Sequence, residues 1–600
     1  MMNATLAASA LPSALLPPRG ALPAAAAALS SAPAATATLV AAWALWTLAS
    51  TLFARAAAAR AMPGDAQTSA HPLALGVSSL LAMVHDPDAF WERQRRLAPD
   101  GLSWNVLSGA LCLFVANASV VNEVLRRSDG RRFGMVLHPN ANIILGRHNI
   151  AFLHGAKHKA LRASFLPLFT KRALGMYLPL QQHVVERHLA CWVAQCAEGE
   201  GAEVEARELC RDMNLETSQA VFLGPRLRAQ DVAGFNLAFM AMVEAFLALP
   251  VFLPGTALWR GWRGRHCVLR VLRRCARAAF EAHAAGEEPQ CLLDLWVARI
   301  VADVAEAKSQ HLPRPAYASV DAVADSVMDF LFASQDASTA SLTWAVAHVA
   351  GRPEVAAQVR AEAAPLLAGG AALTYDGVTG MTYTWQVVKE ILRFRPPATM
   401  VPQVAKQDVT LQCDGGGGFT VRKGTLVMPS LYAASMQGFT QPEKFDPERF
   451  GEARREDLRF KEHFVPFGVG PHMCVGYQYA MNHLVAFVAI LATKLDVSRR
   501  LTDRSDDVLY YPTIYPYDCL CKFAEREESP IAQEAQAHAL APAQQQQQQQ
   551  QQDVQVPVKQ PDVTGGAISP ASEVKKKRSV LGGLKRMFSS KSKQANADKK

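Results

Sequence analysis

Apolar and polar positions follow each other along most of the chain with the spacing of helices. Residues 119–129 (SVVNEVLRRSD) and 383–397 (YTWQVVKEILRFRPP) repeat apolar side chains three or four positions apart, and Pro396 and Pro397 end the second run. Residues 408–428 instead show short apolar runs around a glycine-rich turn, which predicts strands. Between residues 77 and 523 the pattern therefore predicts one mainly helical domain with small β-sheets.

The N-terminal part of the chain has a different pattern. Residues 1–33 are rich in alanine, and residues 34–54 are 21 consecutive uncharged residues, long enough to span a bilayer as a helix. Arg55 and Arg60 follow at once, so the positive-inside tendency places the downstream domain in the cytosol. We predict a single-pass anchor at 34–54 and a linker at 55–76. A cleaved signal or a transit peptide is the alternative, because acid-poor, alanine-rich starts look alike.

The C-terminal part is polar, and its charge changes the interpretation of the whole chain. Residues 524–600 include nine consecutive glutamines at 544–552, which predicts a disordered tail. Residues 575–600 contain ten Lys or Arg and one Asp, so this stretch carries the entire net charge of +9. A basic tail on a neutral body argues against a nucleic-acid-binding face. The eleven cysteines show no paired framework, which fits a chain whose thiols are reduced.

One cysteine has unusual surroundings. The loop FGVGPHMCVG, from Phe467 to Gly476, holds Cys474 among three glycines, directly before an apolar helical pattern. The glycines let the backbone turn closely around the sulfur, and the start of the next helix favours a thiolate. A loop-held thiolate is what an axial haem ligand requires. A structural cysteine with no ligand is the alternative.

The spacing Phe467-x-x-Gly470-x-x-x-Cys474-x-Gly476 resembles the haem-binding signature of the cytochrome P450 family at every fixed position. The resemblance covers about residues 80–522. It implies the P450 fold, haem b with the Cys474 thiolate on its iron, and NADPH-derived electrons delivered by a reductase partner. It also implies that Phe467 and Gly470 shape the haem-binding loop and that His472 contacts a haem propionate.

Further residues arrive in the order of that family. Glu390 and Arg393 stand one helical turn apart, and with Arg449 they match the network that supports the cysteine loop. In HGAKHKALR, His158 and Arg162 occupy positions where the family commonly has Trp and Arg at a propionate.

The segment FLFASQDAST departs from the usual family pattern. Most members have an acid followed directly by threonine, whereas Asp336 is followed here by Ala337 and then Ser338. One residue along a helix is a rotation of about 100°, so Ser338 cannot simply replace the missing hydroxyl. Asp336 and Ser338 are the catalytic candidates. Proton delivery is left to a water chain from Asp336, to a substrate group, or to Ser338 after a local helix distortion. The alternative is that Asp336 has no catalytic role and only caps a bend in the helix.

The same departure is similar to the sterol C-22 desaturases of plants, algae and fungi, where alanine also follows the aspartate. This similarity implies a Δ22 double bond introduced into a sterol side chain, on the membrane of the endoplasmic reticulum or, alternatively, of a plastid. The apolar run 246–259 would receive a lipophilic substrate at the membrane, or would be an ordinary core helix. The residues expected to line the substrate pocket are Phe332, Ala333, Ala398, Thr399, Met400 and Val401.

Three other functions stay open at this point. The first is a sterol or steroid hydroxylase or demethylase of the same family. The second is a haem isomerase that needs no reductase. The third is a binding protein without catalytic activity that uses its polar tail.

Overall fold

The computed structural model describes residues 82–526 except for 98–99, 108–109, 199–201, 413–417, 506 and 512, together with isolated positions between 41 and 70. The chain divides into two units, Met1–Ser529 and Pro530–Lys600, and all described residues lie in the first. No helix in this described part is long and apolar enough to cross a bilayer. Most of the predicted anchor at 34–54 and nearly all of the predicted tail at 524–600 lie outside the described residues.

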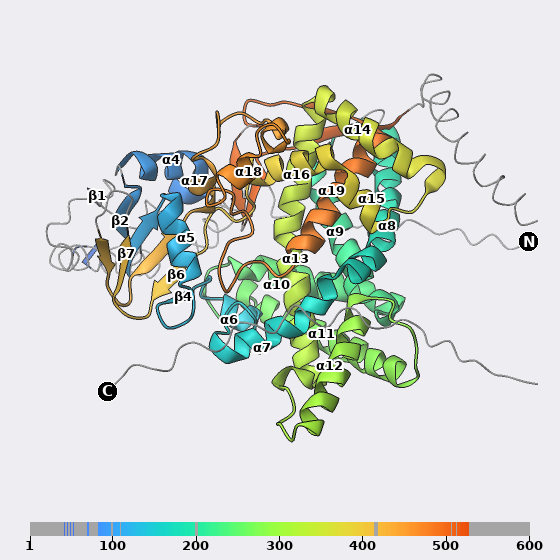
Figure 1. Ribbon diagram of the computed structural model, residues 1–600, viewed down its shortest axis with the longest axis horizontal. Coiled ribbons are helices and arrows are strands. Elements are labelled where there is room, and N and C mark those ends of the chain that lie inside the picture. The colour runs from blue at the N-terminus through green and yellow to red at the C-terminus, as the bar shows by residue number, and fades with distance from the viewer. Residues whose placement is uncertain are drawn as a thin grey trace, which may run out of the picture. The chain divides into compact units, whose positions relative to one another are not determined.

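Helices make up most of the described unit, which confirms the prediction of a mainly helical fold (Figure 1). In chain order they are α4 (Pro87–Leu97), α5 (Ala118–Arg126), α6 (Ala141–Ile144), α7 (Gly155–Phe165), α8 (Lys171–Glu198), α9 (Ala206–Phe222), α10 (Ala229–Phe246), α11 (Ala257–Ala284), α12 (Leu292–Ser309), α13 (Val320–Ala350), α14 (Pro353–Leu367), α15 (Tyr375–Gly380), α16 (Thr382–Phe394), α17 (Leu431–Ser435), α18 (Glu456–Arg459) and α19 (Tyr477–Lys494).

Small sheets complete the fold, as the pattern predicts. The strands are β1 (Ser69–Ala70), β2 (Leu102–Leu107), β3 (Ala110–Val115), β4 (Phe133–Met135), β5 (Val204–Glu205), β6 (Gln403–Ala405), β7 (Val409–Gln412), β8 (Gly418–Val421), β9 (Leu426–Pro429), β10 (Leu495–Arg500), β11 (Val508–Tyr511), β12 (Thr513–Pro516) and β13 (Leu520–Glu525). The largest sheet has the order β1-β2-β3-β9-β6-β4, with β2 antiparallel to β3 and β3 parallel to β9. Figure 1 shows β2, β4, β6 and β7 gathered beside α4, α5 and α17, on one side of the long helices.

Helix α13 is the central element of the helical part. Ser319 caps its N-terminus by accepting a hydrogen bond from the backbone N–H of Ala322, and the helix packs against α9, α11 and α19. Its C-terminal half, from Thr339 to Val349, is buried without interruption. In the middle of the helix, however, Ala333 is exposed and residues 336–338 are only half-buried. An exposed side chain on the central helix indicates open space beside it.

Candidate functional site

The loop before α19 holds Cys474 by a compact set of backbone hydrogen bonds. The Cys474 N–H donates to the Phe467 carbonyl at 3.0 Å, and the Met473 N–H donates to the Gly470 carbonyl at 3.2 Å. Gly470 has a φ of +79°, and a Cβ on it would lie 2.7 Å from the Leu125 carbonyl oxygen at the end of α5. Gly470 is therefore required both for its backbone angle and for the close approach of α5.

The other two glycines of the loop differ from Gly470. Gly468 also has a left-handed backbone, with a φ of +66°, but a Cβ there would meet nothing within 4 Å. Gly476 has a φ of −87°, and a Cβ on it would also meet nothing within 4 Å. The expectation that all three glycines let the backbone turn closely around the sulfur therefore has a steric basis at Gly470 and a backbone-angle basis at Gly468, but neither at Gly476.

The Cys474 side chain faces open space inside the protein. Its side chain is classed as exposed, yet burial raises the pKa of its thiol, and the backbone N–H of Gly476 and the charge of Arg162 only partly oppose that shift. These two observations agree if the thiol borders a hollow that is surrounded by protein. The helix N-terminus does not by itself produce a thiolate here, contrary to the sequence expectation, because burial outweighs it. A bound metal ion deprotonates a coordinating thiol outright.

Three basic side chains from two segments meet beside this loop. Arg162 of α7 donates from Nη1 to the Met473 carbonyl at 2.6 Å, and the rings of His158 and His472 lie 4.3 Å apart between centroids. Burial, together with His158, His154 and Arg162, lowers the pKa of His472 to about 4. Within the described part of the chain, no ion pair joins Arg162, His158 or His472 to a carboxylate. The cluster is thus a set of donors that lacks an anion.

These features satisfy what a haem would require of the residues present. Cys474 offers one soft ligand next to open space, and the adjacent donors can satisfy carboxylates such as haem propionates. At Gly468 and Gly476, no other atom lies within 4 Å of the point that a Cβ would occupy. The donor set and the open space therefore fit a haem with an axial thiolate.

A buried ionic network joins α16 to the segment 435–456, where Arg393 donates to the Ser435 and Lys444 carbonyls. Arg393 donates from Nε and Nη2 to the two carboxylate oxygens of Glu390, at 2.7 and 2.8 Å. The Arg449 Nε lies 3.0 Å from Glu390 Oε2, as an ion pair whose angle is poor for a hydrogen bond, and Arg449 Nη1 donates to Glu456 at 3.1 Å. The side chains of Glu390, Arg393 and Arg449 are all 0% exposed. The structure thus brings together the three residues that the resemblance assigns to one network, and adds Glu456.

The centre of α13 presents one acid with few partners. Burial raises the pKa of Asp336 to about 7, and the charge of Arg211 opposes this rise. The backbone carbonyl of Asp336 accepts hydrogen bonds from the hydroxyls of Thr513 at 3.3 Å and Tyr515 at 3.2 Å. Ser338 is half-buried, and its hydroxyl makes no hydrogen bond to another described residue. Sequence reasoning missed Thr513 and Tyr515, since more than 170 residues separate them from Asp336.

Thr339 is not available as a replacement for the missing hydroxyl. It is 1% exposed, and its Oγ1 accepts a hydrogen bond from Asn214 Nδ2 at 3.3 Å. The same Asn214 amide donates to the carbonyls of Ser334 and Gln335, both at 3.0 Å. Asn214 of α9 therefore holds this stretch of α13 from the side, and no motif in the sequence marks it.

The predicted substrate-lining residues lie in two groups. On α13, Phe332 packs against Phe246 with ring centroids 5.1 Å apart, and Ala333 is exposed. After α16, Ala398 is exposed and Thr399 is 2% exposed. The next two side chains pack on apolar clusters of the sheet region: Met400 on the cluster that includes Phe90, Trp91 and Phe114, and Val401 on the cluster that includes Val120 and Phe133. Their role at the substrate stays a prediction.

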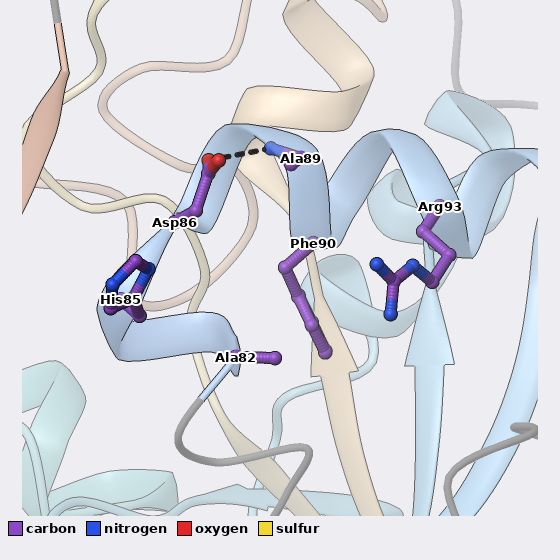
Figure 2. A pocket seen from close by; sticks show the side chains of 6 residues that line it. All are labelled: Ala82, His85, Asp86, Ala89, Phe90 and Arg93. Carbon is purple, nitrogen blue, oxygen red and sulfur yellow. Dashed lines mark hydrogen bonds between the residues drawn. The ribbon is translucent and has the colours of Figure 1, made fainter.

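A second hollow is present at the start of α4, away from these residues in the chain. Its volume is about 390 Å³. Figure 2 shows the residues that line it, which are Ala82, His85, Asp86, Ala89, Phe90 and Arg93. The Asp86 carboxylate there accepts a hydrogen bond from the Ala89 N–H at 2.9 Å. This carboxylate is thus already used in holding the first turn of the helix.

Comparison with known proteins gives consistent matches. Residues 104–506 match the family model described as Cytochrome P450. Cytochrome P450 710A3 of Arabidopsis thaliana is 38% identical over 446 residues, which cover 74% of this chain and 88% of that protein. C-22 sterol desaturase ERG5A of Gibberella zeae is 31% identical over 401 residues, covering 64% of this chain and 74% of that protein.

Solved structures resemble this one in fold. A retinoic acid-bound cyanobacterial CYP120A1 superposes with a TM-score of 0.63 at 23% sequence identity, covering 74% of this chain and 96% of that chain. A cytochrome P450DA haem domain gives the same TM-score at 22% identity, covering 77% of this chain and 98% of that chain. At these identities the likeness concerns the fold alone.

Proposed function

Because this chain belongs to the cytochrome P450 family, we propose that it is a sterol C-22 desaturase that uses dioxygen and NADPH-derived electrons. The observation that carries the choice of reaction is the 31% identity to a protein named C-22 sterol desaturase, over 401 residues. The overall change removes one hydrogen from each of two neighbouring side-chain carbons. With dioxygen, two electrons and two protons, it yields an alkene and two waters.

Cys474 is the proposed axial ligand, and the residues around it hold the cofactor. Arg162, His158 and His472 supply donors for the propionates, and the Phe467 carbonyl fixes the backbone of Cys474. When bound, the haem supplies the oxidant for hydrogen removal, with the thiolate pushing electron density toward the iron. Glu390, Arg393 and Arg449 are the proposed support of the cysteine loop, as the resemblance implies, and take no part in the chemistry.

Asp336 is the proposed group that handles protons. A carboxyl with a pKa of about 7 can hold a proton and release it at neutral pH, which is the property that a general acid needs. The hydroxyls of Thr513 and Tyr515 hold the backbone carbonyl of Asp336 by hydrogen bonds, so the position from which its side chain extends is fixed. The hydroxyl of Ser338, two residues after Asp336, makes no hydrogen bond to another described residue. The hydroxyl of Thr339, in contrast, accepts a hydrogen bond from Asn214. Ser338 is therefore the second proton-handling candidate.

Positioning must decide between desaturation and hydroxylation. Both begin with removal of one hydrogen, so the outcome depends on how the second carbon is presented. Phe332 and Ala333 lie on the same helix as Asp336, and Ala333 borders open space. The methyl side chain of Ala337, directly after Asp336, adds little volume next to the acid. A larger side chain at either alanine would move the sterol side chain relative to the haem.

The tip between α10 and α11 is the proposed entry side for a lipophilic substrate. Leu249, Phe252 and Leu253 there are 80%, 47% and 60% exposed. On α11 beyond this tip, Arg263, Arg270 and Arg277 are exposed on one face, since they are seven residues apart. Exposed apolar side chains next to arginines suit the surface of a membrane with anionic lipids. This surface fits the proposed location on the endoplasmic reticulum membrane.

Expression in yeast that lacks its own C-22 desaturase tests the proposal. The full chain should restore Δ22 sterols, and Cys474→Ser should not. Recovery of hydroxylated or demethylated sterols alone would reject desaturation as the main reaction. In membranes from the same cells, product formation that continues without NADPH and reductase would instead support an isomerase.

A further inference from the structure

His154 occupies the N-cap position of α7 without capping the helix. Its backbone is extended, with φ −136° and ψ 166°, but its side chain makes no hydrogen bond to the first turn. Instead its Nδ1 lies 3.2 Å from Nε2 of His472, and the two rings meet edge to face at 5.1 Å and 77°. A residue 318 positions away along the chain thus contacts the histidine that lies two residues before Cys474.

The fold leaves dedicated room for this ring. Gly130 has a φ of +79°, and a Cβ on it would lie 2.5 Å from both Cβ and Cγ of His154. Gly134 in β4 also borders the ring, but less tightly, because a Cβ there would lie 3.5 Å from His154 Nε2, an ordinary contact, and 2.9 Å from Lys406 Cε on a flexible side chain. A methyl group at Gly130 would displace the ring. The position of His154 is therefore determined by its surroundings and not by helix capping.

We propose that His154 is a positioning residue that orients His472 so that its ring donates a hydrogen bond to a haem propionate. The proposal rests on the haem assignment and not on the sterol substrate. His154 was not marked by any family signature in the sequence. Its contact with His472 is the observation that carries the inference.

The two ring nitrogens of His472 explain why the contact matters. A neutral histidine carries its proton on one nitrogen and accepts on the other. If His154 Nδ1–H donates to His472 Nε2, the proton of His472 sits on Nδ1, which can then donate to a carboxylate. In the opposite arrangement, Nδ1 would be a bare acceptor and would repel a carboxylate. The propionate and His154 therefore select the same tautomer of His472.

Lys406 favours the same arrangement from the far side of His154. The Lys406 ammonium and His154 Nε2 both flank Gly134. Burial lowers the pKa of His154, the charge of Lys406 lowers it further, and Asp129 opposes both. An ammonium group only donates, so a neighbouring Nε2 is best left as an acceptor. The remaining proton of His154 then lies on Nδ1, facing His472.

The test measures how fast the haem-loaded full chain in detergent loses haem to excess apomyoglobin, followed by the Soret band. His154→Ala should lose haem about five- to tenfold faster than wild type, the effect of one hydrogen bond. His154→Asn should restore slow loss, because its amide nitrogen occupies the place of Nδ1. His154→Gln, whose amide reaches the place of Nε2, should not.

A second pair of variants keeps the histidine and changes its position. Gly130→Ala should speed haem loss as His154→Ala does, because the new methyl group displaces the ring. Gly369→Ala is the control, since Gly369 has a φ of +63° and open space around it. It carries the same backbone strain and should not change the rate.

Several outcomes would overturn the proposal. Haem loss from His154→Ala at the wild-type rate would do so, and so would equal rates for His154→Asn and His154→Gln. If His154→Ala lowers the thermal stability of the haem-free chain as much as that of the loaded chain, the residue is only structural. A wild-type chain that takes up no haem contradicts the haem assignment itself, and is distinguished by its missing spectrum.

Discussion

Buried charges in the network of Glu390, Arg393, Arg449 and Glu456 are paired, whereas the buried acid at the centre of α13, Asp336, has no ion-pair partner among the described residues. Glu390 and Arg449 are fully buried and have charged partners on both sides, whereas Asp336 is surrounded by protein with only the charge of Arg211 acting on it. A buried charge that is fully paired is fixed in place, and removing one partner is costly. A buried acid without a close partner stays near its neutral form and can exchange a proton. We therefore propose that the first arrangement builds the site and that the second serves the reaction.

Glu390→Gln tests the rigid side of this comparison and should have the largest effect. The change leaves Arg393 and Arg449 without the carboxylate that faces them in the interior, which should cost about 3–5 kcal/mol in the free energy of unfolding. We expect loss of the thiolate-type ferrous–carbon monoxide spectrum together with loss of folded protein in urea titrations.

A surface glutamate with two arginine partners provides the matched control. Glu92 accepts hydrogen bonds from Arg95 and Arg96, but these side chains are 35–77% exposed. Glu92→Gln should therefore change the unfolding free energy by less than about 1 kcal/mol. Equal costs for the two variants would contradict the view that burial makes the network rigid.

Asp336→Asn tests the reactive side. No ion pair is broken, so the chain should fold and keep its carbon monoxide spectrum. Turnover should fall by about 10²-fold or more, because the proton-handling group is gone. The measurement compares product formation with NADPH consumption and hydrogen peroxide release in the same reaction. Unchanged product yield per NADPH would remove Asp336 from the mechanism.

Ala337→Thr should have a smaller effect that bears on the product. The variant places a hydroxyl directly after the acid, as in most members of the family, at a half-buried position. We expect the share of hydroxylated sterol to rise severalfold against the Δ22 product, measured by mass spectrometry. Ala340→Thr, at a fully buried position on the same helix, is the control for bulk and should mainly lower stability. An unchanged product ratio would show that Ala337 does not influence the outcome.

The sequence predicts the cysteine loop and the paired network far better than the surroundings of Asp336 on α13. The Cys474 loop, Glu390, Arg393 and Arg449 carry fixed spacings, and each contact among them follows from chemistry that is local or strongly paired. The partners of Asp336 and Thr339 come from α9 and β12, so only the folded chain reveals Thr513, Tyr515 and Asn214. The place of His154 could not be predicted from the sequence for the same reason, because its neighbours Gly130 and His472 come from other segments of the chain. Ala333 is exposed although it lies on the central helix, and the pattern of apolar and polar residues does not predict this exposure.

The pH dependence of stability should carry opposite signs at the two regions. Burial raises the pKa of Asp336 from 3.8 to about 7, so the folded chain holds that proton more tightly than the unfolded chain. The resulting stabilisation is complete below pH 4 and is lost as the pH rises through about 7.

Glu456 in the network behaves in reverse: burial would raise its pKa, but hydrogen bonds from Arg454, Thr440 and Arg449 lower it overall from 4.5. Its stabilisation is present above pH 4.5 and is lost on further acidification. In urea titrations, Asp336→Asn should gain stability relative to wild type between pH 5 and 8, and the deficit of Glu456→Gln should shrink below pH 4.5. A slope of the same sign for both variants would contradict the division between a paired scaffold and an unpaired acid.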